Sequence, residues 1–249
     1  MSQVSCKWAS AHWIRFPSIE TPETLDLSGR PSGASSWKIG ADGPPGPDIQ
    51  RLPTPIWAAL GLYETRAAAE HAVDEPLLFM PFLERAEESW HALLQPFAHR
   101  GECNHLDPSK PGELFEIEGD DPGGPLMVMT SAGFNLGPDL DLGRVLDFRR
   151  NVDRAREQAD GADGNLGHRV FTPHVPGEDG VTMTLWRDEA ALFKFAYRPG
   201  LHRSLLDRHK VEPMADRSSF TRFRVLKSFG SWEGRDPTAA AAERAAAEA

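Results

Sequence analysis

The sequence predicts an α+β protein made of two ferredoxin-like units arranged in tandem. A strand, a helix, a short helix and a strand follow one another twice along the chain. A stretch rich in Pro, Gly and Asp at 104–125 separates the two copies. The second copy can be extended upstream to a complete βαββαβ unit. We therefore expect a first unit at 1–110 with long loops, a second unit at 126–235 and an Ala-rich tail at 236–249.

The first copy begins with a run of apolar and aromatic residues at 56–63, which is typical of a strand. Strong helix formers follow at 64–73, and apolar residues at helical spacing predict a second helical segment at 77–90. A strand at 90–101 closes the copy. The earliest strand and helix of this unit would fall within 17–55, where Pro, Gly and Ser are dense and predict long loops.

The second copy contains a segment, 181–186, in which polar and apolar residues alternate as in a half-buried strand. The other elements of a ferredoxin-like unit have matching patterns on both sides of it. Upstream are a strand at 125–134, a helix at 142–158 and a strand at 167–175; downstream are helices at 187–197 and 201–211 and a strand at 219–230. Two such sheets could face each other and enclose a pocket, with the helices outside.

The composition narrows the class of protein. The formal net charge is -10 and no run of Lys or Arg occurs, which argues against a nucleic-acid partner. The two cysteines, Cys6 and Cys103, cannot build a disulfide framework or a CxxC metal site, which fits a reducing compartment. The N-terminus lacks the apolar core of a signal peptide, and no apolar run is long enough to span a bilayer. We therefore expect a cytoplasmic protein without a transmembrane segment.

Motifs for several common chemistries are missing from the sequence. It has no GxSxG nucleophile motif, no P-loop and no GxGxxG after a strand. The spacings HxH and HExxH and the set of two His with one carboxylate are also missing, which argues against a dedicated zinc or non-haem iron site. Nothing in the sequence indicates a flavin or nicotinamide site.

Ordered motifs across residues 35–235 carry a resemblance to a known family. In the second half they are VTMTLWRDEAALFKFAYRPGLHRSLLDRH and SFTRFRVLKSFGSWEG, and in the first half WKIGADGP, IWAALGLYET and RAEESWHALLQPFAHRG. The series resembles the spheroidene monooxygenases. The resemblance implies an α+β barrel of tandem ferredoxin-like units that carries a b-type haem. It also implies oxygen-dependent oxidation of a hydrophobic substrate. Because nothing in the sequence indicates a flavin or nicotinamide site, we expect a ferredoxin or reductase to supply the electrons.

The chain departs from the family pattern in two places. PMADRSS at 213–219 replaces an acidic-aromatic segment before the last strand, and the N-terminal region is longer and more polar. The carotenoid that named members oxidise is therefore not carried over to this chain. We expect a small, mainly hydrophobic substrate.

The haem that the resemblance implies needs an axial ligand, for which His202 is the best match. Gly200 can end the preceding helix, so that a short helix would begin near His202. Leu205 and His209 then lie on the same face, which would point toward a pocket between helix and sheet. His209 is the nearest alternative ligand.

Four further residues are candidates for this site. Arg198 and Arg203 could bind the haem propionates, because a guanidinium pairs with a carboxylate in a two-pronged geometry, although plain surface charge is the simpler interpretation of each. His168 and His174 lie six residues apart on a predicted strand and therefore share a face. They are candidates for a distal acid or base.

Three functions fit these observations. The first is a haem-dependent monooxygenase or oxidase. The second is haem-dependent dehydration or rearrangement of the aldoxime-dehydratase type, in which His168 or His174 would donate a proton. The third is a cofactor-free barrel that binds a ligand or oxidises an electron-rich aromatic directly, because ferredoxin-like barrels host many functions. A monomer and a homodimer both fit the sequence.

Overall fold

A computed structural model describes residues 6–43, 52–101, 123–135, 137–172 and 178–239. This part of the chain contains eight strands, four α-helices and two 3-10 turns. The strands are β1 (Trp8–Glu20), β2 (Ala34–Ala41), β3 (Thr54–Tyr63), β4 (Glu88–Gly101), β5 (Leu126–Gly133), β6 (Asn165–Phe171), β7 (Gly180–Trp186) and β8 (Arg217–Gly230). The helices are α1 (Arg66–Asp74), α2 (Leu142–Asp160), α3 (Glu189–Tyr197) and α4 (Leu201–Val211), and the turns are η1 (Pro76–Leu78) and η2 (Pro81–Arg85). None of the described helices is long and apolar enough to cross a membrane.

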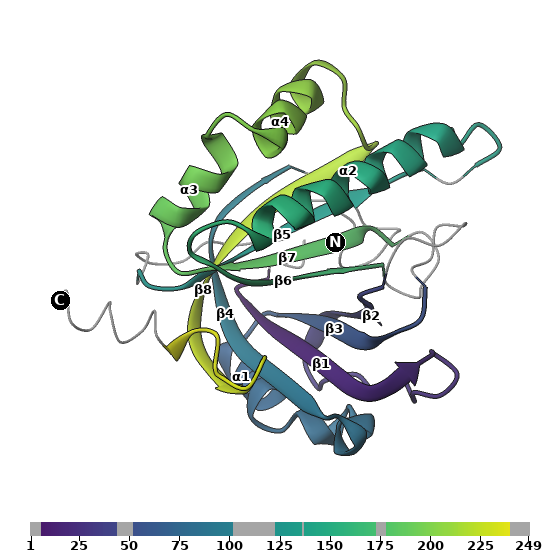
Figure 1. The fold of residues 1–249 in the computed structure, drawn as a ribbon. Helices are drawn as coiled ribbons and strands as arrows, with labels where there is room; N and C mark the ends of the chain where they lie inside the picture. Colours follow the sequence, from purple (N-terminus) through teal and green to yellow (C-terminus); the bar gives the residue numbers. More distant parts are fainter. Residues whose placement is uncertain (1–5, 44–51, 102–122, 136, 173–177, 240–249) are drawn as a thin grey trace.

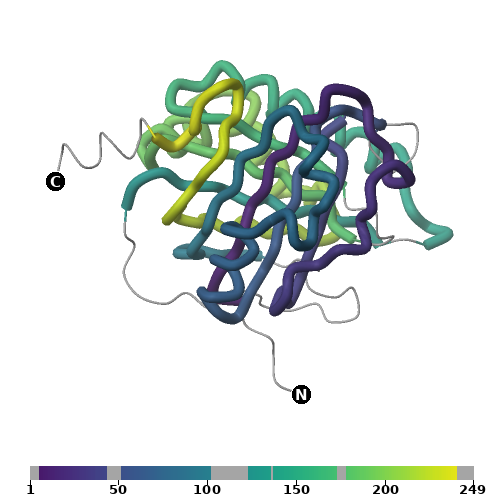
Figure 2. Tube along the Cα trace, turned by 90° about the horizontal axis from the view of Figure 1, so that it is seen from below, coloured from purple at the N-terminus to yellow at the C-terminus, as the bar shows by residue number. Residues whose placement is uncertain are grey.

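The strands form one curled antiparallel sheet in the order β2-β3-β1-β4-β8-β5-β7-β6 (Figure 1). Read outward from the middle of the sheet, each half has its strands in the order fourth, first, third and second. This is the strand order of a ferredoxin-like unit. The long strands β4 and β8 pair from Trp90 with Gly230 to Gly101 with Ser219 and so join the halves (Figure 2). The predicted fold class, α+β with two ferredoxin-like units, is confirmed.

Side chains from both halves of the sheet fill the space that the curled sheet encloses. Trp13 and Trp90 of the first half belong to one core cluster with Met127, Met183 and Phe223 of the second, and all five are fully buried. The prediction of a pocket between two facing sheets is therefore wrong for the described residues. The helices cover the outer faces, α1 over the first half and α2, α3 and α4 over the second (Figure 1).

Ion pairs link the two edge strands, β2 and β6, which lie at opposite ends of the hydrogen-bonded order. Asp42, directly after β2, accepts from Arg169 of β6 at 3.4 Å and from Arg156 of α2 at 3.0 Å. Lys38 Nζ of β2 lies 2.8 Å from Glu178 Oε1, just before β7. Side-chain contacts thus connect the two edges of the curled sheet, where no backbone pairing joins the described strands.

Two strands lie where the sequence predicts long loops. β1 runs as far as Glu20 and β2 lies wholly inside the segment 17–55, so the prediction for that segment is wrong in these parts. Ala9, Ala11 and Trp13 of β1 alternate into the core between the halves, which is the period of a strand. The described residues between β1 and β2 form turns and contain no helix.

The helical segment predicted at 77–90 is also wrong. Pro76 and Pro81 each begin a short 3-10 turn, because proline suits the first turn of a helix but removes a backbone donor further along. Phe82 of η2 is buried against the core beneath α1, which explains the apolar spacing. β4 begins at Glu88.

The predicted tail and central break lie largely outside the described residues, as does Cys103. The start of the tail is bound to the sheet. Asp236 accepts a hydrogen bond from Trp90 Nε1 at 3.1 Å and from Ser228 Oγ at 2.9 Å.

Candidate functional site

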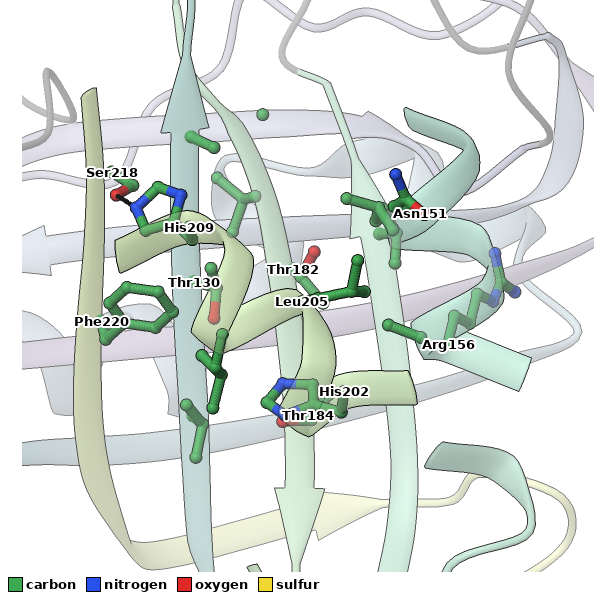
Figure 3. A pocket seen from close by; sticks show the side chains of 18 of the residues that line it. Thr130, Asn151, Arg156, Thr182, Thr184, His202, Leu205, His209, Ser218 and Phe220 are labelled. Carbon is green, nitrogen blue, oxygen red and sulfur yellow. Dashed lines mark hydrogen bonds between the residues drawn. The ribbon is translucent and has the colours of Figure 1, made fainter. Parts of the chain in front are cut away.

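A cavity of about 690 Å³ lies between the outer face of the second half-sheet and helices α2, α3 and α4 (Figure 3). This volume is in the range of pockets that hold a small molecule or cofactor. The sheet contributes Thr130, Thr182 and Thr184 from β5 and β7, and α4 lies over them with His202 and His209. Most of the remaining lining is apolar.

The helix that carries His202 is held by a neighbouring helix. α4 begins after Gly200 and has no side-chain cap of its own. Gln158, near the end of α2, accepts a hydrogen bond from the backbone N–H of His202 at 2.9 Å. α2 itself is capped by Asp141, whose carboxylate accepts a hydrogen bond from the N–H of Arg144. A side chain from α2 therefore fixes the position of His202.

His202 presents a neutral imidazole to the cavity. Burial lowers the pKa of His202, and the carbonyl of Ala196 acts in the opposite direction. Nδ1 lies 3.4 Å from Ala196 O in a long hydrogen bond, which places the ring proton on Nδ1. The ring packs against Phe195 with 4.6 Å between centroids. Nε2 therefore keeps its lone pair, an arrangement typical of metal-binding histidines, whose other nitrogen donates to a carbonyl or carboxylate.

Both ring nitrogens of His209 are engaged. Nδ1 accepts from the N–H of Met214 at 3.2 Å, so the proton of the neutral ring is on Nε2, 3.2 Å from Ser218 Oγ. Burial lowers the pKa of His209, and the charge of Arg100 lowers it further. Although His209 lines the cavity as His202 does, it has no nitrogen lone pair left for a metal.

His168 lies in the cavity wall on β6 with 6% of its surface exposed. Burial lowers its pKa to about 3, with help from the charges of Arg156 and Arg169. Nδ1 of His168 is 2.9 Å from Asp160 Oδ1 of α2, but the angle between them is not that of a hydrogen bond. The Asp160 side chain is 59% exposed, and partial desolvation of its carboxylate raises the pKa. His174, the other residue of the predicted pair, lies outside the described residues.

The backbone before His168 is irregular. The register between β6 and β7 shifts between Asn165 and Gly167, and such bulges redirect the side chains that follow them. Gly167 has a φ of 147°, and an added Cβ would come within 2.9 Å of the Trp13 ring. Glycine is required here for β6 to pack on the core between the halves.

The structure does not bring Arg198 or Arg203 into the cavity. Arg198 is exposed at the end of α3, and Arg203 Nε donates to Asp207 of the same helix, α4, at 2.8 Å. The arginines that line the cavity are Arg100, Arg149, Arg156 and Arg222. No carboxylate partner of Arg100 lies among the described residues. The alternation of β4 is the part of the signal for Arg100 that the sequence carries, whereas its register opposite Phe220 of β8 appears only in the structure.

In the described ranges, no group of three or more His, Cys, Asp or Glu residues could hold a bare metal ion. A haem needs less from the protein, because the macrocycle supplies four ligands and a single axial side chain completes the site. His202, which lines the cavity with Nδ1 engaged by Ala196 O, could serve as such a single ligand.

Comparison with known proteins finds relatives that are similar in sequence to this chain, although no family model matches it. The spheroidene monooxygenase of Rhodobacter capsulatus is 26% identical over 184 residues, 74% of this chain and 72% of the relative. The spheroidene monooxygenase of Cereibacter sphaeroides is 23% identical over 188 residues, 73% of this chain and 53% of the relative, so the match spans about half of that protein. The chain is spheroidene monooxygenase-like. The resemblance seen in the sequence motifs is thereby confirmed.

The fold has a counterpart among solved structures. An aldoxime dehydratase crystallised with butyraldoxime matches 94% of this spheroidene monooxygenase-like chain and 85% of its own, with a TM-score of 0.58 and 8% identity. At this identity the match shows a shared fold alone. It covers both halves of the sheet.

Proposed function

We propose that this protein is a haem-dependent, monooxygenase-like oxidoreductase that acts on a small, mainly hydrophobic molecule in the cavity beneath α4. The observation that carries the proposal is the neutral His202, whose Nδ1 is engaged by Ala196 O while Nε2 is left with a lone pair at an apolar cavity. The two relatives named spheroidene monooxygenase support an oxygenase-type activity.

The residues present fit a haem. His202 would hold the iron, and the apolar lining would cover the macrocycle. Arg100, exposed and without a carboxylate partner in the described chain, is the first choice for a propionate, in place of Arg198 and Arg203. When bound, a haem supplies oxygen activation and one-electron chemistry.

The chain's own residues would bind the substrate, exclude water and control protons. Apolar side chains from α2 and α3, such as Val152 and Leu192, would shield the site. With Asp160 beside Nδ1, His168 would offer Nε2 as a hydrogen-bond acceptor, and its pKa, lowered to about 3, would keep the ring neutral. We expect a ferredoxin or reductase to supply electrons, in the cytoplasm.

A second candidate function is dehydration or rearrangement of the aldoxime-dehydratase type, favoured by the fold shared with the aldoxime dehydratase complex. It also uses the cavity and His202. Oxygen and reductant separate the two, because the monooxygenase needs both and a dehydratase needs neither as a co-substrate. The third candidate, a cofactor-free barrel, predicts activity that His202→Ala leaves intact.

The proposal is tested by the absorption spectrum of the protein, purified after expression with a haem precursor. We expect a Soret band that shifts with dithionite and carbon monoxide. It should weaken in His202→Ala and persist in the matched variant His209→Ala. A colourless protein that also fails to bind added hemin would overturn the proposal.

A further inference from the structure

Neither ring nitrogen of His168 makes an aligned hydrogen bond to a described residue, although Nδ1 lies 2.9 Å from Asp160 Oδ1. The side chain is 7% exposed, and Nε2 is shielded from solvent without a hydrogen bond to any described residue. Nearly all buried polar atoms in native proteins are paired, because an unpaired one costs stability. An unpaired nitrogen beside a cavity therefore points to a group that the cavity receives.

The neighbourhood of the ring decides what this nitrogen can do. Nδ1 lies 2.9 Å from the carboxylate of Asp160, which attracts the ring proton to Nδ1. In this tautomer Nε2 carries a lone pair and accepts hydrogen bonds. The missing partner is therefore a donor.

The cationic neighbours of His168 do not supply that donor. Arg156 and Arg169 both direct NH1 at Asp42, at 3.0 and 3.4 Å. Val170, the next residue on the same face of β6, and Phe195 of α3 line the cavity with apolar side chains, which have no hydrogen-bond donor. No described residue supplies the donor.

We infer that the cavity takes a compact ligand with a hydroxyl or N–H group, whose hydrogen bond His168 Nε2 accepts, and that it disfavours a pure hydrocarbon or ether of the same shape. The inference rests on the proposed function only in taking this ligand for the substrate. The volume of about 690 Å³ suits a ligand of one or two rings beside or in place of a cofactor.

The test compares two probes of nearly equal shape, 2-naphthol and 2-methoxynaphthalene, by isothermal titration into the purified full-length protein. Only the first can donate a hydrogen bond. We expect 2-naphthol to bind about tenfold more tightly, the effect of one hydrogen bond to a buried group. His168→Phe should remove the difference by weakening 2-naphthol alone. Thr182→Val, which removes a hydroxyl elsewhere in the same cavity, is the matched control and should keep the difference.

A second variant guards against misfolding of His168→Phe. Asp160 has a side chain 59% exposed at the end of α2, and Asp160→Ala frees the ring proton to move to Nε2. It should reduce the preference without unfolding the protein. Equal affinities in the wild type, a preference kept in both variants, a preference lost in Thr182→Val, or no binding of either probe would each overturn the inference. A His168-dependent preference in a protein that binds no hemin would leave the inference standing and overturn the proposed function.

Discussion

Gln158 accepts a hydrogen bond from the backbone N–H of His202 at 2.9 Å, so a side chain of α2 performs the capping that α4 lacks. The proposed iron ligand is thereby positioned by a residue 44 positions earlier in the chain. The same helix carries Asp160, which faces His168. α2 thus positions both histidines of the proposed site.

Gln158→Ala should loosen the start of α4 and the orientation of His202. We expect a loss of about 1 kcal/mol in the free energy of unfolding, as for other lost caps, and roughly tenfold weaker hemin binding. Gln158→Glu keeps an acceptor at neutral pH and is the matched control. Denaturant unfolding and hemin titration measure the two effects. Unchanged hemin affinity in Gln158→Ala would show that Gln158 does not position His202.

Breaking the Asp42–Arg169 contact should destabilise the fold strongly. The guanidinium of Arg169 lies between Trp13 and Trp232, at 4.6 and 3.9 Å from the ring centroids, and burial lowers its pKa to about 10. Asp42→Ala would leave this charge buried and unpaired, at a cost of about 3–5 kcal/mol. Urea unfolding measures the cost. Arg156→Ala, which removes the more exposed partner of Asp42, should cost less, and equal losses in the two variants would contradict this account.

Acid should destabilise the first half through two buried histidines. His12 Nδ1 lies 2.8 Å from His91 Nδ1, and burial lowers the pKa of His91 to about 4 and that of His12 well below its usual value. Between pH 6.5 and 4 the unfolded chain binds more protons than the folded one, so the free energy of unfolding falls as the pH falls. His91 alone accounts for about 3 kcal/mol by pH 4.

Urea unfolding at pH 7, 5.5 and 4.5 measures this slope. The double variant His12→Phe, His91→Leu should show a shallower slope, even if it is less stable at pH 7. His71, exposed on α1, is the control site, and His71→Gln should leave the slope unchanged. An equal slope in the wild type and the double variant would contradict the role of the pair.

The second half of the fold could be predicted from the sequence because its signals are local. α4 spans the predicted residues 201–211, since Gly200 separates it from α3, and β7 follows the alternation of 181–186. β1 and β2 were missed because Pro and Gly in the same region outweighed their alternation. The segment 77–90 was misassigned because burial, not a helix, sets its apolar spacing.

The candidate site was predicted only in part. His202, Leu205 and His209 line one cavity, as their helical spacing predicts. The cavity lies outside the sheet because the aromatic side chains of both halves fill the interior. No local sequence pattern reveals this filling. Arg100 lines the cavity through strand register, whereas Arg198 and Arg203, closer to His202 in sequence, do not line it.

The central claim is that His202 holds a haem iron, and the most direct test is a hemin titration of His202→Gly with and without added imidazole. The wild type should show a Soret band that saturates at equimolar hemin. Removing an outer-shell partner of a metal ligand lowers affinity roughly 10- to 100-fold, and His202→Gly should lower the hemin affinity by more than that. Added imidazole should restore the Soret band. If His202→Gly binds hemin as the wild type does, or if the wild type binds none, His202 is not the ligand and the account fails.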